Sequence, residues 1–199
     1  MLEVLNISKS YNRKKVLNAV SFVLAPGTLT GIIGENGSGK STLLKIIMGE
    51  ICADQGTVHV KGSIGYCPQE SLVFPTLTVE ENIHYFASAY GLANKIKWKA
   101  YQDELIRQFG LMTYLKKRND KLSGGTRQKL NLSISLLHDP DICILDEPYG
   151  GFDWETYQHF WELILQLKGK GKSILLVTHL LNDLKHFDHI LTLKEGQFI

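Results

Sequence analysis

The chain reads Gly34-Glu35-Asn36-Gly37-Ser38-Gly39-Lys40-Ser41-Thr42 directly after a short β-branched run, Thr28 to Ile33. This stretch fits the phosphate-loop pattern of a glycine, four residues and then Gly-Lys-Ser, and a helical apolar pattern follows it as far as Gly49. Glycines let successive backbone N–H groups turn toward an anion, and the next helix points its positive end at the same place. The stretch therefore predicts a strand, a phosphate-binding loop and a helix.

Two side chains of this loop carry specific chemistry. Lys40 brings a full positive charge to the β- and γ-phosphates of a nucleotide, and Ser41 is placed to bind Mg²⁺. Every fixed position of the pattern is matched, so an ordinary glycine-rich turn is the weaker interpretation. The residues expected to contact the nucleotide are Gly34, Asn36, Gly37, Ser38, Gly39, Lys40, Ser41 and Thr42.

A second acidic element supplies what such a loop still needs, a metal ligand and a group that orients the attacking water. The apolar run Ile142 to Leu145 ends in Asp146 and Glu147. A buried parallel strand presents these carboxylates at the carboxyl end of the sheet, where α/β proteins bind ligands. We expect Asp146 to hold the metal and Glu147 to act as general base.

Composition excludes several classes of protein. The 199 residues carry 22 Lys and Arg against 20 Asp and Glu, a net charge of +2, which gives no sign of a nucleic-acid-binding or membrane-surface protein. No apolar run approaches the roughly 18 residues that a membrane-spanning helix needs. The first residues do not form a secretory signal, which favours the cytoplasm. Cys52, Cys67 and Cys143 are too far apart for a metal-ligand pair and indicate reduced, mostly buried thiols.

The pattern along the chain indicates a single α/β domain with an insertion. Strand-like runs occupy Leu2 to Ser8, Val16 to Leu24, Gly56 to Val60 and Ser63 to Tyr66, and Ile174 to Val177 is a second unbroken apolar run. Thr78 and Glu81 form a capping box that opens a helix, and from there to His138 the apolar spacing is helical. We therefore predict a mainly parallel core with a β-rich edge over 1–77 and 139–199, and a helical subdomain over 78–138.

A third motif, Leu122-Ser123-Gly124-Gly125, precedes a helical pattern and offers an anion site at a helix start. With this motif the sequence resembles the ATP-binding subunit of ATP-binding cassette (ABC) transporters. The parts follow the order of that family: phosphate loop, Gln69, Leu-Ser-Gly-Gly, a strand ending in Asp-Glu, and His179. The resemblance covers nearly the whole chain and implies a P-loop ATPase with ATP and Mg²⁺ as cofactors.

The resemblance also implies further site residues. Tyr11 matches the aromatic residue that stacks on adenine, Gln69 the residue that touches Mg²⁺ and water, and His179 the histidine that contacts the γ-phosphate. Asp153 matches an aspartate that in the family takes part in signalling between two paired subunits. Gly150 and Gly151 make the backbone before it more flexible than is usual in the family. Thr126 stands where the family often has glutamine. This difference does not affect the small residues before it, whose backbone N–H groups contact ATP in the family.

In the family, Ser123, Gly124 and Gly125 complete the nucleotide site of a second copy. The resemblance therefore implies a head-to-tail pair, either two copies or one copy with a homologous ATPase subunit, with two ATP molecules between them. It also implies integral membrane subunits as partners and a place on the cytoplasmic face of the cell membrane. The segment from Thr78 to Leu92 resembles the branch that serves small exporters of drugs, peptides and antibiotics.

Two other functions remain open. A soluble ABC ATPase acting on ribosomes or DNA is the first, although such proteins usually carry two cassettes or long coiled-coil insertions. A GTPase or small-molecule kinase is the second. The base-reading pattern Asn-Lys-x-Asp of GTPases is absent, because the nearest match, Asn94 to Lys97, ends in lysine.

Overall fold

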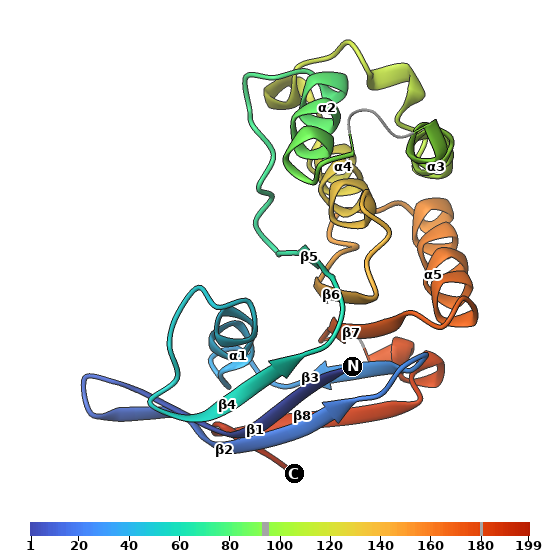
Figure 1. The fold of residues 1–199 in the computed structure, drawn as a ribbon. Coiled ribbons are helices and arrows are strands. Elements are labelled where there is room, and N and C mark those ends of the chain that lie inside the picture. Colours follow the sequence, from blue (N-terminus) through green and yellow to red (C-terminus); the bar gives the residue numbers. More distant parts are fainter. Residues whose placement is uncertain (93–95, 180) are drawn as a thin grey trace.

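The computed structural model describes residues 1–92, 96–179 and 181–199. Two sheets form its lower part (Figure 1). The smaller sheet is antiparallel and contains β1 (Leu2–Tyr11), β2 (Lys14–Leu24) and β4 (Gln55–Val60) in the order β2-β1-β4. This sheet is the predicted β-rich edge, and its strands fall where the alternating apolar pattern placed them.

The larger sheet is parallel except at one edge. Its order is β5-β6-β7-β3-β8-β9, and only β9 (Gln197–Phe198) pairs antiparallel. The parallel strands are β3 (Leu29–Ile33), β5 (Ile64–Cys67), β6 (Ile142–Asp146), β7 (Ser173–Val177) and β8 (His189–Lys194). The strands β6 and β7 are buried along their whole length, as their unbroken apolar runs predicted.

Both faces of the parallel sheet are covered. Helix α1 (Lys40–Ile47) lies between the two sheets, and its Leu43 and Leu44 share a core cluster with Ile144. On the opposite face, Cys143 packs in a second cluster with Phe160 of α5 (Trp154–Gly169). Successive residues of β6 thus enter opposite cores, which fixes the strand and the carboxylates at its end.

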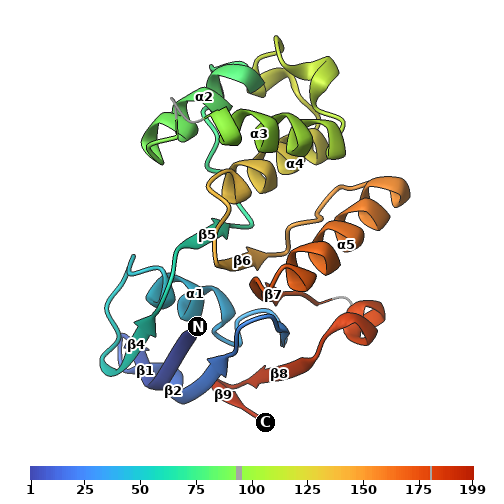
Figure 2. The same cartoon turned by 45° about the vertical axis from the view of Figure 1, so that its right-hand side comes forward.

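The helices α2 (Val79–Ala89), α3 (Ile96–Gln108) and α4 (Gly124–Leu136) gather at the far end of the molecule from the antiparallel sheet (Figure 2). The described residues between Thr78 and His138 also include the short helices η1 (Met112–Tyr114) and η2 (Asn119–Lys121), and no strand beyond an isolated bridge. A third short helix, η3 (Leu181–His186), precedes β8. The division at residues 78 and 138 into a core and a helical subdomain remains a prediction.

Two local predictions are confirmed. Thr78 caps α2, its Oγ1 accepting from the Glu81 backbone while the Glu81 carboxylate accepts from the Thr78 N–H, so the capping box is complete. All three cysteines are free; Cys67 and Cys143 are buried, whereas Cys52 is exposed. Within the described residues, no helix is long and apolar enough to cross a membrane.

Candidate functional site

The loop between β3 and α1 depends on glycine backbone conformations. Gly37 has φ 82° and Gly39 φ 110°, a region that L side chains rarely adopt. A Cβ at Gly39 would also lie 2.9 Å from the Val16 carbonyl oxygen and 2.8 Å from a Leu17 methyl group. Strand β2 thus approaches the loop so closely that only glycine fits there.

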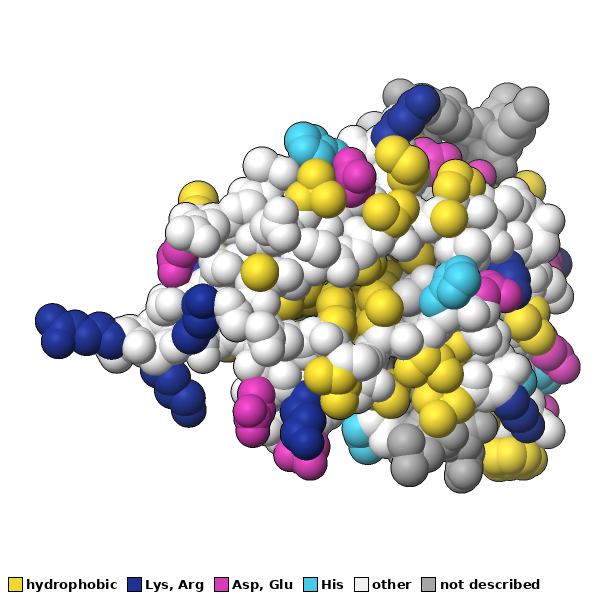
Figure 3. Space-filling model, turned by 90° about the horizontal axis from the view of Figure 1, so that it is seen from below, with side chains coloured by type: hydrophobic (Ala, Val, Ile, Leu, Met, Phe, Trp, Pro, Cys, Tyr) yellow, Lys and Arg dark blue, Asp and Glu magenta, His cyan; other side chains and the backbone are white. Residues whose placement is uncertain are grey.

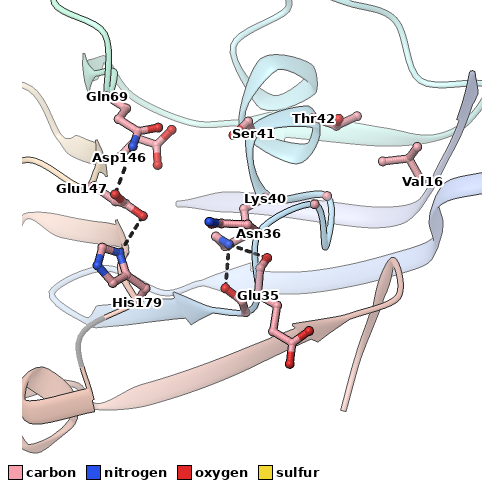
Figure 4. Close-up of a pocket in the computed structure, with 13 residues that line it drawn as sticks. Val16, Glu35, Asn36, Lys40, Ser41, Thr42, Gln69, Asp146, Glu147 and His179 are labelled. Carbon is pink, nitrogen blue, oxygen red and sulfur yellow. Dashed lines mark hydrogen bonds and ion pairs between the residues drawn. The ribbon is translucent and has the colours of Figure 1, made fainter.

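Lys40 is the first residue of α1, and its side chain turns back into the loop. Its Nζ donates to the carbonyl oxygens of Gly34, at 2.7 Å, and Glu35, at 2.9 Å (Figure 4). The residue is 9% exposed, so its charge sits inside the curved backbone. The N-terminus of α1 points at the same space, and together they form an anion-binding cradle.

The carboxyl end of β6 brings two carboxylates toward this cradle. Asp146 is 7% exposed, and its pKa is raised to about 6 because of burial and the nearby Glu147 charge, against the opposing effect of Lys40. Glu147 leaves the strand with φ 48°, in the left-handed region, while its N–H still donates to the Val177 carbonyl oxygen. This turn aims the Glu147 side chain away from the strand direction.

Glu147 is held from two sides. Gln69 Nε2 donates to its Oε2 at 3.1 Å, and His179 Nδ1 donates to its Oε1 at 2.9 Å. Gln69 follows β5 and His179 follows β7, the two neighbours of β6 in the sheet. Figure 4 shows the three side chains in one line across the strand ends. The carboxylate therefore has a fixed orientation, which a general base requires.

These groups surround one cavity of about 570 Å³. The predicted site residues that line it come from the loop, from Gln69, and from the ends of β6 and β7. They are Gly34, Asn36, Gly37, Gly39, Lys40, Ser41, Thr42, Gln69, Asp146, Glu147 and His179. The structure thus brings together residues separated by more than half of the chain.

The predicted residues outside this cavity are Tyr11, Ser38, Ser123, Gly124, Gly125 and Asp153. Ser38 is buried behind the loop and lines a smaller cavity beside β8. Ser123 caps α4 by accepting from the Thr126 N–H, and Asp153 caps α5 by accepting from the Thr156 N–H. Tyr11 is 46% exposed at the end of β1.

The start of α4 is packed against the loop before α5. A Cβ on Gly125 would lie only 2.2 Å from the Gly151 carbonyl oxygen, so the two backbones touch. Gly124 lines a second cavity of about 580 Å³, which shares Gln69 and Glu147 with the first. The Leu-Ser-Gly-Gly motif is therefore a neighbour of Glu147 but not a wall of the phosphate cradle in its own chain.

Two lining residues were not predicted, Val16 and Glu35. Glu35 lies within the loop pattern at a position that the pattern leaves free. Val16 is the extra residue on β2 between the pairs Ser10–Lys15 and Lys9–Leu17, a β-bulge that brings the strand to Gly39. No local sequence signal marks that bulge.

The donors available suit a hard divalent cation. Among the described residues no group of three or more His, Cys, Asp or Glu side chains could enclose a metal. The buried Asp146 carboxylate, the Ser41 hydroxyl and the Gln69 amide oxygen line the same cavity. Oxygen donors of this kind, together with phosphate oxygens and water, are what Mg²⁺ takes in nucleotide sites.

Comparison with known proteins agrees with this geometry. The profile of the ABC transporter family matches residues 17–150, which hold the phosphate loop, Gln69, Leu-Ser-Gly-Gly and Asp146-Glu147. The chain belongs to the ABC transporter family. It is an ATP-binding subunit of that family and an ATPase.

Relatives of this ABC ATPase include transporter subunits from bacteria and archaea. The linearmycin resistance ATP-binding protein LnrL of Bacillus subtilis is 32% identical over all of this chain and 68% of its own length. The uncharacterized ABC transporter ATP-binding protein MJ1023 of Methanocaldococcus jannaschii is 34% identical over 100% of this chain and 76% of its own length. The Nod factor export ATP-binding protein I of Paraburkholderia xenovorans is 33% identical over 100% of this chain and 69% of its own length. Of ABC transporter G family member 20 from Dictyostelium discoideum the chain spans only 28%.

Solved structures give the same fold. A structure described as the ATP-binding subunit of an ABC transporter has a TM-score of 0.94 and 31% identity, covering 100% of this chain and 88% of its own. The dimeric post-hydrolysis state of the ATP-binding cassette MJ0796, bound to ADP and Pi, has a TM-score of 0.90 and 25% identity, covering 100% and 96%. The ABC ATPase therefore shares its whole architecture with cassettes that bind nucleotide.

Proposed function

We propose that this ABC ATPase hydrolyses MgATP in a dimer and thereby drives export through separate membrane subunits. The observation that carries the proposal is the Gln69–Glu147–His179 arrangement beside the phosphate loop. It provides an oriented carboxylate within one cavity with a phosphate-binding cradle. An ATP-driven transporter subunit needs both parts.

The residues of the cavity take distinct roles in this proposal. The loop backbone and Lys40 hold the β- and γ-phosphates, and Asp146, Ser41 and Gln69 hold the Mg²⁺. Bound Mg²⁺ supplies positive charge that offsets the developing charge on the phosphates. Glu147 accepts a proton from the attacking water as the bond from the γ-phosphorus to the bridging oxygen breaks. His179 orients Glu147 and faces the γ-phosphate.

A second subunit completes the site. Ser123, Gly124 and Gly125 lie at the N-terminus of α4, where free N–H groups attract anions, yet they do not line the phosphate cavity of their own chain. In a head-to-tail dimer these residues would close on the γ-phosphate held by the partner. Asp153 and the glycines before it would lie between the two sites. Tyr11 would stack on the adenine ring at the other end of the nucleotide.

Export is proposed from the relatives. LnrL is a resistance protein and the Nod factor protein is an export protein by name, and both align with the whole of this chain. Membrane subunits would place the ATPase on the cytoplasmic face of the cell membrane. No nucleic-acid partner is expected, because the chain is close to neutral.

Affinity purification from detergent-solubilised membranes tests the partner. We expect a tagged subunit to recover an integral membrane protein with several spanning helices, and ATPase activity that changes when this protein is present. The soluble alternative predicts ribosomal proteins or DNA in the same eluate, and their recovery without a membrane protein would contradict the transport proposal.

A further inference from the structure

Strand β2 begins with an exposed lysine, Lys14, two residues before the cavity-lining Val16, and the proposed function gives it no role. Strands β1 and β2 are joined by Asn12 and Arg13, with φ 47° and 65°, as in a type I′ hairpin turn. This turn fixes the register and sets Lys14 directly opposite Tyr11. Side chains of such a cross-strand pair stand about 5 Å apart on the same face of the sheet.

That face is the inner one. Ile7 is fully buried in the cluster that contains α1, and Lys9 and Tyr11 follow it at intervals of two residues, so all three point to the side of α1. Lys14, as the partner of Tyr11, points the same way. Its neighbour Lys15 pairs with Ser10 and points to the opposite face.

The cavity reaches toward this position. Figure 4 shows Val16 at the end of the cavity away from His179, on the other side of Ser41 and Thr42. Lys14 lies two residues before Val16, about 7 Å along an extended strand. A nucleotide with its γ-phosphate beside Glu147 therefore has its α-phosphate and ribose toward Lys14.

The charges of the lining residues allow a second lysine to bind the nucleotide at the outer end of the cavity. Lys40 lines the cavity together with three acidic residues, Glu35, Asp146 and Glu147. The other amines of the hairpin are already engaged, since Lys9 Nζ pairs with Asp54 at 2.9 Å and Lys15 Nζ donates to Asn18 at 2.6 Å. The Lys14 side chain forms no hydrogen bond or ion pair with the described residues and is exposed, and Figure 3 shows basic side chains projecting from the hairpin tip.

We propose that Lys14 is a nucleotide-binding residue whose ammonium group contacts the α-phosphate side of ATP from strand β2. This inference rests on the proposed ATP site and adds a contact at its outer end. The contact is made to both ATP and ADP, because both carry the α-phosphate. It lies far from Glu147, so it contributes to affinity and not to the hydrolysis step.

Calorimetric titration of Lys14→Met and Lys15→Met with MgATP and MgADP tests the assignment. Both variants remove one exposed charge from adjacent positions, so they change the long-range field equally. We expect Lys14→Met to bind both nucleotides about fivefold more weakly, with less loss at high salt, and Lys15→Met to bind as the wild type does. Lys14→Arg, which keeps the positive charge, is expected to bind both nucleotides as tightly as the wild type does.

Two results would overturn the inference alone: normal affinity in Lys14→Met, or equal losses in Lys14→Met and Lys15→Met. In both, the wild type still binds ATP and the proposed function stands. A wild-type protein that binds neither nucleotide would instead contradict the proposed function, and this inference with it.

Discussion

Glu147 is held in a conformation that its own backbone disfavours. A non-glycine residue in the left-handed region costs on the order of 1 kcal/mol, and the structure offsets this with the Val177 carbonyl and the side chains of Gln69 and His179. The strain turns the carboxylate out of the β6 direction and into the cavity. Such an outlier at the end of a buried strand is typical of functional sites.

In the proposed site, phosphate binding depends most on Lys40. Lys40→Ala removes the only lysine that lines the cavity, as far as the described residues go, and with it the charge-assisted contact to the β- and γ-phosphates. We expect ATP affinity to fall at least about tenfold, the scale of one charged hydrogen bond. Lys45→Ala on the exposed side of α1 is the matched control, and calorimetry measures both. ATP binding of normal strength in Lys40→Ala would remove the phosphate-loop assignment.

In the proposed site, Asp146 is the carboxylate that holds Mg²⁺. Asp146→Asn removes the negative charge beside Glu147, while the amide has the same shape as the carboxylate. We therefore expect an intact fold, and hydrolysis reduced at least about tenfold because a metal ligand is lost. In this variant Mg²⁺ is expected to raise the affinity for ATP less than it does in the wild type. Glu35→Gln removes the charge of another residue that lines the cavity, and this control is expected to retain the Mg²⁺ effect. A steady-state ATPase assay over a range of Mg²⁺ concentrations decides between a metal ligand and a structural acid.

At the scale of elements, the capping box fixes where α2 begins after the loop that follows Gln69. Thr78→Ala loses the cap to the Glu81 N–H and exposes an unpaired helix donor, which costs about 1 kcal/mol. We expect urea unfolding at a lower midpoint with an unchanged slope. Thr113→Ala in the exposed helix η1 is the control. Equal stability of the two variants would mean that the cap does not support the helix.

The sequence predicted the elements that depend on short-range residue patterns. The strand, loop and helix around Lys40 follow from glycine positions and apolar periodicity, and the Thr78 cap from one short motif. The bulge at Val16 and the buried Asn82, which bonds the backbone of Phe74 and Leu77, were not predicted. The bulge depends on how β2 pairs with β1, and the Asn82 bonds depend on the irregular path of the chain before α2. Apolar periodicity reports neither.

At the scale of the whole molecule, the parallel sheet gathers Gln69, Glu147 and His179 because the strands before them are neighbours. Because β5, β6 and β7 are adjacent, the residues that follow them line one cavity, although they come from three separate motifs. The loop residues, Asp146 and Glu147 were predicted from their own motifs. Gln69 and His179 were predicted only through the family resemblance, since no spacing rule places residues 69, 147 and 179 together. The Ser123 to Gly125 segment stays outside it, and this is the structural reason for proposing a dimer.

The dimeric composite site is the central claim, and Glu147→Gln tests it most directly. The amide keeps the shape of the carboxylate but cannot accept the proton of water, so ATP stays bound and holds two subunits together. Gel filtration with MgATP is expected to show a Glu147→Gln dimer. Adding Ser123→Arg dissociates it by bulk and misplaced charge, whereas Ser88→Arg on exposed α2 does not. A monomer with ATP bound, or a dimer that Ser123→Arg leaves intact, would contradict the account.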